Sequence, residues 1–211
     1  MKIDFVSDVS CPWCAIGLAA LDIALAALPP ELPVELHFQP FELDPSMPRE
    51  GRDLLEILQQ KYGMTPEQVQ ANQDNIRQRG EVLGFEFRMD RRTRSYNTFD
   101  AHRLLLWAGL EGGQHELKQA LFKAYFTDGD NPGDPDLLLR LAAEVGLDTV
   151  RAHEILHSDE FADEVRERER FYLDAGIHSV PAVIIDDRHL ISGGQPPEVF
   201  ERALRQIAGL A

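Results

Sequence analysis

The chain has 211 residues, 44% of them hydrophobic, which is enough apolar material for one large globular domain or a domain with another inserted into it. Its 21 Lys and Arg against 36 Asp and Glu give a net charge of −15, so most of the surface should repel nucleic-acid backbones and anionic membranes. This charge favours neutral, basic or small partners, and it indicates no particular oligomeric state.

The first apolar run, residues 2 to 7, predicts a strand rather than a secretory signal. Asp4 and Asp8 interrupt the apolar stretch in which a signal peptide would have its hydrophobic core, and no run in the chain approaches membrane-spanning length. We therefore expect a cytoplasmic protein that does not enter a membrane.

A Cys-x-x-Cys motif, Cys11-Pro12-Trp13-Cys14, follows this strand and holds both cysteines of the chain. Pro12 has no N–H and a φ already suited to a helix, so it fits the first helical position and makes Cys11 the N-cap. The free amides of Trp13 and Cys14 and the positive end of the helix dipole then favour a thiolate and lower the pKa of Cys11. Cys14 lies one turn further in, where it can attack a mixed disulfide held on Cys11. These two thiols suffice for a redox cycle.

Two other uses of the cysteine pair fit the sequence less well. A structural zinc site needs four ligands, usually from paired Cys or His motifs, and the seven histidines have no matching spacing. A purely structural disulfide would close a small loop and constrain little chain entropy. We expect a redox-active dithiol and no metal.

The segment after the motif predicts a βαβ unit. A helix that is apolar nearly all round is predicted from residue 12 to about 28, and an alternating strand from 34 to 39, in which His37 takes the polar phase. With the usual right-handed crossover, the motif falls at the carboxyl end of the first strand, where open α/β sheets place their sites.

Helix follows helix between residues 49 and 176. Thr65-Pro66-Glu67-Gln68 is a capping box with proline at the first helical position. Ser158 is predicted to cap the last of these helices, which ends at Gly176, and the alternating charges of residues 163 to 170 predict a solvated face. The other helices are expected near residues 53–62, 97–107, 117–125 and 137–145.

Strands return near the end of the chain. Residues 182–185 and 189–192 predict a hairpin, and residues 199–207 an amphipathic helix. The order β-α-β, helical block, β-β-α predicts an α/β protein of thioredoxin-like fold with an inserted all-helical domain. Its core would consist of residues 1–48 and 177–211, and the insertion of residues 49–176.

Several phrases of the sequence together resemble one family over essentially the whole chain. They are Cys11-Pro12-Trp13-Cys14, Gln39-Pro40-Phe41-Glu42-Leu43, the eight residues from Asn97 to Leu104, Val180-Pro181, and Ser192-Gly193-Gly194-Gln195-Pro196. This combination resembles the DsbA-like thioredoxin family, in particular its cytosolic FrnE-type branch. The resemblance implies a dithiol-disulfide oxidoreductase in which Cys11 is the nucleophile, Cys14 is the resolving thiol, and Pro181 is cis beside the active site.

The neighbours of the dithiol are candidate substrate contacts. A cis Pro181 would hold the Val180 backbone next to the Cys11 sulfur, with its N–H and C=O free to pair with an extended substrate. Trp13 is either a substrate-facing aromatic or a hydrophobe that covers the helix start. His102 is either a satisfied core histidine or, as the resemblance implies for the phrase that begins at Asn97, part of the cleft between the two domains.

The sequence leads to three functional hypotheses. The first is thiol-disulfide exchange on protein or small-molecule disulfides, with no metal, flavin or nucleotide cofactor and with glutathione as a candidate reductant. The second is a glutathione-dependent activity like that of the 2-hydroxychromene-2-carboxylate isomerases and kappa-class glutathione transferases, which are similar in plan. Those enzymes have a serine where Cys11 stands and an Asp-Arg pair where Gln195-Pro196 stands. The third is a redox-linked chaperone or binding module that holds unfolded protein or an aromatic molecule in the cleft.

Overall fold

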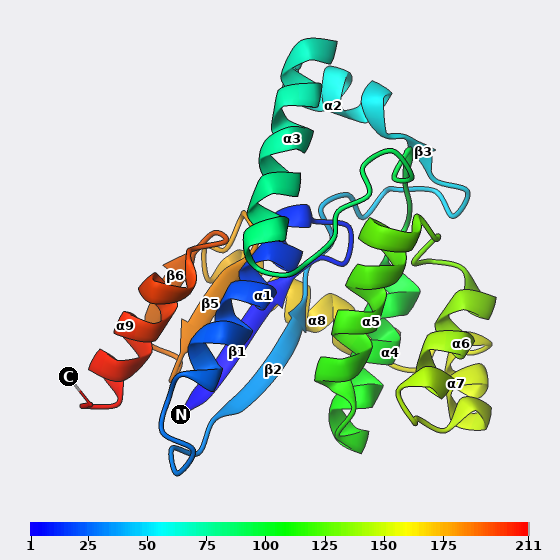
Figure 1. Cartoon of the computed structure of the whole chain (residues 1–211). Coiled ribbons are helices and arrows are strands. Elements are labelled where there is room, and N and C mark those ends of the chain that lie inside the picture. The colour runs from blue at the N-terminus through cyan, green and yellow to red at the C-terminus, as the bar shows by residue number, and fades with distance from the viewer. Residues whose placement is uncertain (211) are drawn as a thin grey trace.

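A four-stranded mixed sheet forms the centre of the protein in the computed structural model, which describes residues 1–210 (Figure 1). The strand order is β2-β1-β5-β6. β1 is parallel to β2 and antiparallel to β5, and β5 is antiparallel to β6. The strands are β1 (Lys2–Ser7), β2 (Glu35–Pro40), β5 (Ala182–Ile185) and β6 (His189–Ser192). The predicted βαβ unit and the predicted terminal hairpin thus belong to one sheet.

Helices cover both faces of this sheet. The helix that follows the cysteine motif, α1 (Pro12–Ala26), packs beside the terminal helix α9 (Pro197–Ile207). Successive side chains of β1 point to opposite faces of the sheet. Phe5 lies in the cluster that contains α1 and α9, whereas Val6 packs on the other face with Tyr172 of α8 (Ala162–Asp174). The thioredoxin-like arrangement predicted from the order of elements is confirmed.

The segment between β2 and β5 is mostly helical. Figure 1 shows α2 and α3 projecting above the sheet and α4 to α7 beside it. Its helices are α2 (Leu54–Tyr62), α3 (Pro66–Val82), α4 (Phe99–Glu111), α5 (Gln114–Lys123), α6 (Pro135–Glu144), α7 (Thr149–Leu156) and α8. The predicted capping box at Thr65 and Gln68 is present, and α5 continues into a π-helical turn, Ala124–Asp128. Two short strands, β3 (Arg52–Asp53) and β4 (Arg94–Ser95), pair with each other near α2.

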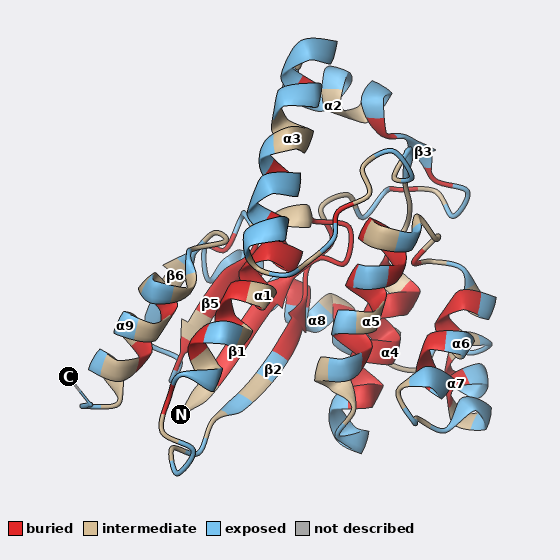
Figure 2. Cartoon of the chain, in the orientation of Figure 1, coloured by how far each residue is buried: buried red, intermediate tan, exposed pale blue. Residues whose placement is uncertain are grey.

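The helical segment shares its core with the sheet. Ile76 of α3 and Phe122 of α5 pack in the same buried cluster as Cys14 and Phe38, whereas α4 to α7 form a second cluster around Leu104. In Figure 2 buried residues are concentrated in the sheet, α1 and α4, while α2 and α3 are largely exposed. The boundaries at 48/49 and 176/177 stay a prediction.

A side chain of α5 pairs with the edge of the sheet. The Oε1 atom of Gln114 accepts a hydrogen bond from the Phe38 amide at 2.9 Å, and its Nε2 donates to the Phe38 carbonyl oxygen at 3.1 Å. β2 is the edge strand on this side. The carboxamide of Gln114 therefore takes the place of a neighbouring strand at Phe38.

Two local expectations are wrong. The last helix of the insertion begins at Ala162 and not at Ser158, which follows the unpredicted helix α7 and bonds back to the Ile155 carbonyl. Residues 163–170 are not a wholly solvated face, because Glu169 is 7% exposed and Arg166 pairs with Glu42.

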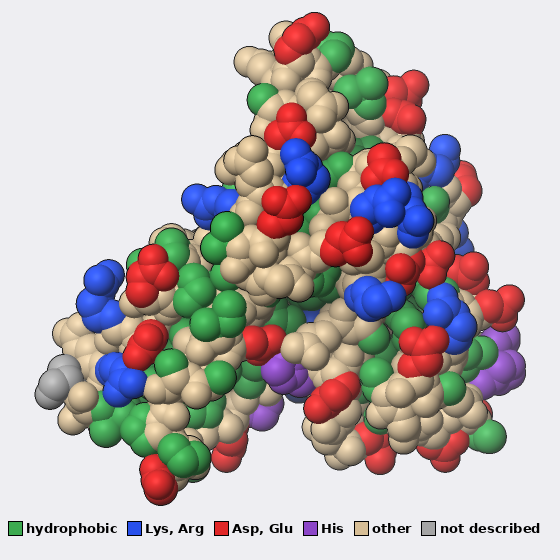
Figure 3. All heavy atoms as spheres, in the orientation of Figure 1, with side chains coloured by type: hydrophobic (Ala, Val, Ile, Leu, Met, Phe, Trp, Pro, Cys, Tyr) green, Lys and Arg blue, Asp and Glu red, His purple; other side chains and the backbone are tan. Residues whose placement is uncertain are grey.

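The surface carries charge of both signs. Figure 3 shows acidic side chains spread over the visible face, with Lys and Arg between them. Within residues 1–210, the structure contains no helix that is both long and apolar enough to cross a membrane.

Candidate active site

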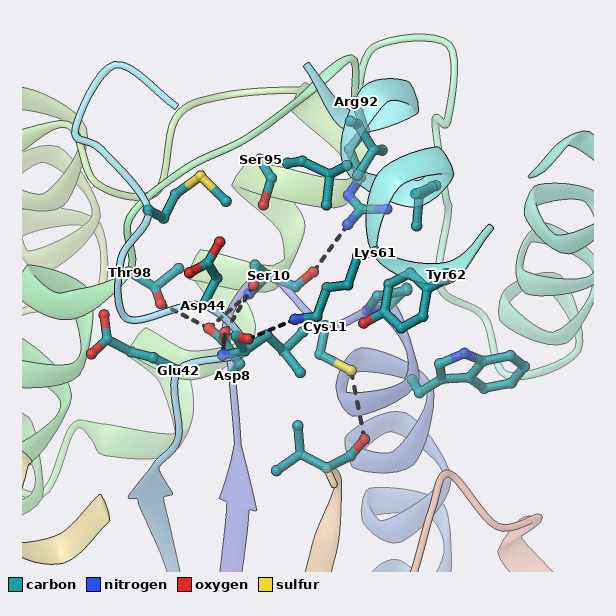
Figure 4. Close-up of a pocket in the computed structure, with 18 of the residues that line it drawn as sticks. Asp8, Ser10, Cys11, Glu42, Asp44, Lys61, Tyr62, Arg92, Ser95 and Thr98 are labelled. Atoms are coloured by element: carbon teal, nitrogen blue, oxygen red, sulfur yellow. Dashed lines mark hydrogen bonds between the residues drawn. The ribbon is translucent and has the colours of Figure 1, made fainter. Parts of the chain in front are cut away.

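Cys11 occupies the position that the sequence predicts, at the N-cap of α1. Its backbone is extended, with φ −91° and ψ 114°, and Pro12 takes the first helical position. The Cys11 side chain is 4% exposed, and its thiol donates a weak hydrogen bond to the Val180 carbonyl oxygen at an S···O distance of 3.7 Å (Figure 4). The nucleophile predicted from the motif therefore contacts the segment that precedes Pro181.

The two thiols have opposite pKa shifts. Hydrogen bonding from the Cys14 thiol, aided by the amides of Cys14 and Trp13, lowers the pKa of Cys11 against the opposing effects of burial and of Asp8. Burial raises the pKa of Cys14 well above its ordinary value, the charge on Cys11 raises it further, and Lys118 lowers it. Both cysteines are free thiols in the part of the chain that the structure describes. Cys11 is thus disposed to be the thiolate and Cys14 the protonated partner.

Pro181 lies directly behind the motif. The Val180–Pro181 peptide bond is cis, the conformation that the resemblance implies. Gly17 of α1 allows this close approach, because a Cβ at Gly17 would lie 3.0 Å from Pro181 Cγ. Cys11, Val180 and Pro181 are therefore held together by the packing of α1 on the start of β5.

A buried carboxylate, Asp8, lies at the end of β1. Its oxygens accept four hydrogen bonds, from the Ser10 amide and hydroxyl, the Leu43 amide and the Thr98 hydroxyl. His102 Nε2 lies 3.5 Å from Asp8 Oδ1, an ion-pair distance. Burial alone would raise the pKa of Asp8, but the attraction of His102 and the amide hydrogen bonds lower it to about 2. Asp8 thus joins the strand end, the loop after β2 and the start of α4.

A cavity of about 690 Å³ opens beside Cys11. Its floor includes Cys11, Trp13 and Val180 from the sheet side. Its roof is formed by α2 and α3, which contribute apolar side chains such as Ile57 and Ile76. Its size suits a small organic molecule or a few residues of an extended peptide.

Two basic side chains, Lys61 and Arg92, line this cavity, and a third, Arg79, stacks on Trp13. Lys61 of α2 donates to the Leu43 carbonyl oxygen at 3.0 Å, and Arg92 donates to the Ser10 carbonyl oxygen at 3.1 Å (Figure 4). The Arg79 guanidinium lies 5.3 Å from the centre of the Trp13 ring. Lys61 and Arg92 are the cations available to pair with an anionic substrate group, in a cavity that Asp8, Glu42 and Asp44 also line.

The structure brings together some of the predicted site residues and separates others. Cys11, Pro12, Trp13 and Val180 line the cavity, with Cys14 and Pro181 buried behind them. Asn97 and His102 lie outside the cavity. Asn97 Nδ2 donates to the Met47 carbonyl oxygen at 2.9 Å, and His102 is buried beside Asp8. Their assignment as substrate contacts stays a prediction, and both support the cavity wall.

Sequence reasoning missed two buried charges beside the dithiol. In the sequence, the position of Asp8 argues only against a signal peptide and indicates no role at the site. Lys118 is fully buried in α5, where its phase matches the apolar residues Leu117 and Leu121. A lysine on the buried phase of an otherwise apolar helix face was the available signal, since charged residues are rarely fully buried without a partner. Among residues 1–210 there is no group of three or more His, Cys, Asp or Glu side chains that could hold a metal ion.

Comparison with known proteins identifies the family. The DsbA-like thioredoxin domain matches residues 2–205. An uncharacterized protein of Bacillus subtilis, YwbO, is 32% identical over 205 residues, which are 97% of this chain and 96% of that protein. The crystal structure of a probable DsbA oxidoreductase from Streptomyces coelicolor is 37% identical, with a TM-score of 0.92 over 100% of this chain and 91% of that one.

More distant structures share the fold alone. A cytosolic disulfide reductase from Pseudomonas aeruginosa, DsbM, solved with GSH, is 18% identical, with a TM-score of 0.68 over 100% of both chains. A 2-hydroxychromene-2-carboxylate isomerase is 16% identical, with a TM-score of 0.70 over 100% of both chains. The match to the family model, which spans nearly the whole chain, and the two relatives above 30% identity agree with the site geometry: this chain is a member of the DsbA-like thioredoxin domain family of oxidoreductases and isomerases.

Proposed function

We propose that the protein is a thiol-disulfide oxidoreductase that works through the Cys11–Cys14 dithiol. One observation carries the proposal: Cys11, with a lowered pKa, borders a cavity, while Cys14, with a raised pKa, lies fully buried behind it. Only a thiolate is a good attacking and leaving group in disulfide exchange. The pair thus separates an attacking sulfur that borders the cavity from a resolving sulfur that lies behind it.

The proposed reaction has two exchange steps. The Cys11 thiolate attacks a substrate disulfide, an S–S bond forms between Cys11 and one substrate sulfur, and the other sulfur leaves as a thiolate. Cys14 then loses its proton and attacks Cys11, which releases the second substrate thiolate and leaves a Cys11–Cys14 disulfide. The protein is oxidised by two electrons and the substrate disulfide is reduced. The same steps run in reverse when the protein starts as the disulfide.

Val180 is proposed to orient the substrate. Its carbonyl oxygen accepts the weak hydrogen bond from the Cys11 thiol, so its backbone stands where a chain bonded to Cys11 would pass. Trp13 and the basic groups of the cavity would hold the remainder of the substrate. We propose either a protein segment or a small molecule as substrate, and the cytoplasm as the place of action.

Glutathione is proposed as the reductant of the disulfide form. The cavity volume of about 690 Å³ accommodates a tripeptide thiol, and Lys61 and Arg92 would attract its carboxylates. The fold similarity to DsbM, which was solved with GSH, is in keeping with this proposal. A glutathione-dependent isomerase is less well supported, because Cys11 stands where such enzymes have a serine and the chain carries Cys14 as well.

The deciding experiment is equilibration of the purified protein in glutathione redox buffers. We expect a reversible two-electron couple between about −120 and −270 mV, the range of thioredoxin-like proteins, and Cys14→Ser should accumulate a mixed disulfide on Cys11. Cys11→Ser is the matched control, which should accumulate none. Thiols that form no reversible disulfide over this range would rule out the proposed function and favour the glutathione-dependent or binding hypotheses.

A further inference from the structure

Lys118 is a fully buried charged side chain that makes no hydrogen bond. Its Nζ has no hydrogen-bond partner anywhere in residues 1–210. It lies 4.9 Å from the centre of the Phe122 ring and 5.9 Å from that of Phe38. Ring faces attract a cation only weakly compared with a hydrogen-bonded anion. The ammonium group is therefore poorly compensated.

The same apolar cluster contains the resolving cysteine. Phe38, Phe122 and Cys14 all belong to the buried core around α1, so Lys118 and Cys14 share one water-poor environment. Burial lowers the pKa of Lys118 to about 8, and the anions that oppose this shift are, in order, Cys14, Asp8 and Cys11. The oxygens of Asp8 already accept four hydrogen bonds. Cys14 is thus the anion for which Lys118 is best placed.

A structural role does not account for this lysine. A buried charge without a hydrogen-bonded partner costs several kcal/mol of folding stability, and an apolar side chain of similar length would fill the same space. Methionine, which is unbranched and flexible, is such a side chain. The stability of the fold therefore offers no reason for a charge at this position, whereas the chemistry of a buried thiol does.

We propose, building on the proposed function, that Lys118 is a positioning residue of the dithiol, whose buried ammonium group stabilises the negative charge on Cys14 during attack on the mixed disulfide at Cys11. In this step the Cys14 S–H bond breaks and the proton passes to solvent. The Cys14–Cys11 S–S bond forms, the bond between Cys11 and the substrate sulfur breaks, and the substrate leaves as a thiolate. Lys118 keeps its proton throughout.

The groups that set the field at Lys118 come from two other parts of the fold. Cys11 and Cys14 face it from the start of α1, and Asp8 from the end of β1. Lys118 lies on α5, a helix of the predicted insertion, so the positive charge that acts on Cys14 belongs to the insertion. The insertion would thus contribute to the chemistry of the dithiol as well as to the shape of the cavity.

Stopped-flow reaction with the aromatic disulfide 5,5′-dithiobis(2-nitrobenzoate) separates the two steps. Cys11 attack releases one coloured thiolate, and Cys14 attack releases the second. If Lys118→Met raises the pKa of Cys14 by one unit, the thiolate fraction falls about tenfold. The thiolate that remains is about threefold more nucleophilic, so the second phase should slow about threefold at neutral pH. The pH at which the rate of the second phase increases should also shift to a higher value.

Two further variants keep the test decisive. Lys118→Gln also removes the charge but keeps a polar head, so the same slowing in both variants assigns the effect to charge and not to size. Lys123→Met removes an exposed lysine from the end of the same helix and should change neither phase. The first phase should stay within about twofold of the wild type in every variant, because Cys11 attack does not require Cys14 to ionise.

Different outcomes overturn different statements. A second phase with unchanged rate and pH profile in both Lys118 variants would overturn the role of Lys118. Equal slowing of both phases would also do so, since it would indicate a general disturbance of the site. A wild-type protein that releases only one thiolate would instead contradict the proposed function, because the internal disulfide would not form.

Discussion

Two buried charges act on the cysteine pair, and their surroundings differ. Asp8 accepts four hydrogen bonds from three separate segments of the chain. Lys118 lies against aromatic rings and donates no hydrogen bond to any residue between 1 and 210. A charge with all its partners in place holds segments together. A charge without them is available to respond when a neighbouring group becomes ionised.

The largest expected effect on stability comes from removing the Asp8 carboxylate. Asp8→Asn offers one carbonyl oxygen, which can accept at most two of the four hydrogen bonds, so we expect a loss of about 4 kcal/mol in the free energy of unfolding. Urea denaturation at neutral pH measures it. Asp74→Asn, which removes a partly exposed pair with Arg77, is the control and should cost less than about 1 kcal/mol. A loss as small as that of the control would mean that Asp8 does not join the three segments.

The contribution of Lys118 to stability should change with pH at the alkaline end of the range. The pKa of Lys118 is lowered from 10.5 to about 8, so between these values the unfolded chain holds the proton that the folded chain has released. Stability contributed by this group therefore rises with pH over that window, by about 3 kcal/mol. The difference in unfolding free energy between Lys118→Met and wild type, both kept reduced, should shrink from pH 8 to pH 10.5. A difference that is constant with pH would contradict a buried ammonium.

Acid should reduce the contribution of Asp8 to the free energy of unfolding. The pKa of Asp8 is lowered from 3.8 to about 2, so the unfolded chain binds the proton first as the pH falls. The stabilisation by Asp8 is complete above about pH 4 and is lost as the pH falls through 2, a change of about 2 kcal/mol. Acid unfolding curves of wild type and Asp8→Asn should converge over this window. Parallel curves would show that the carboxylate keeps an ordinary pKa.

The smallest expected effect lies at the cavity roof. Arg79 of α3 stacks on Trp13 and donates to the Gly194 carbonyl oxygen at 3.4 Å. Because this contact is exposed, Arg79→Ala should lower stability by less than about 1 kcal/mol. Thermal denaturation provides the measurement, with Arg77→Ala on the same helix as control. A much larger loss would mean that α3 depends on this contact for its position.

Local sequence signals predicted the part of the site that lies within one segment. The N-cap position of Cys11 follows from Pro12, and the capping box at Thr65 from four adjacent residues. The hairpin was also predicted, because its strands are neighbours in the chain. The order of these elements was then enough to predict the thioredoxin-like sheet.

Contacts between distant segments could not be predicted in the same way. Asp8 accepts hydrogen bonds from Leu43 and Thr98, which are 35 and 90 residues away, and no local pattern links them. The start of α8 was missed because Phe161, its N-cap, adopts a positive φ of 62° and is not one of the usual capping residues. Helix α7 is only 8 residues long, although its cap at Asp148 was a usable signal.

The pairing of Gln114 with Phe38 determines which sheet edge another chain could join. An open edge strand offers free amide and carbonyl groups to a passing strand, which is a route to aggregation. At Phe38 of β2 both groups already bond to the Gln114 carboxamide, so a strand cannot add there without displacing α5. The opposite edge, β6, is short and ends the sheet. In the four-stranded sheet, β6 is therefore the edge more open to addition of an extended polypeptide.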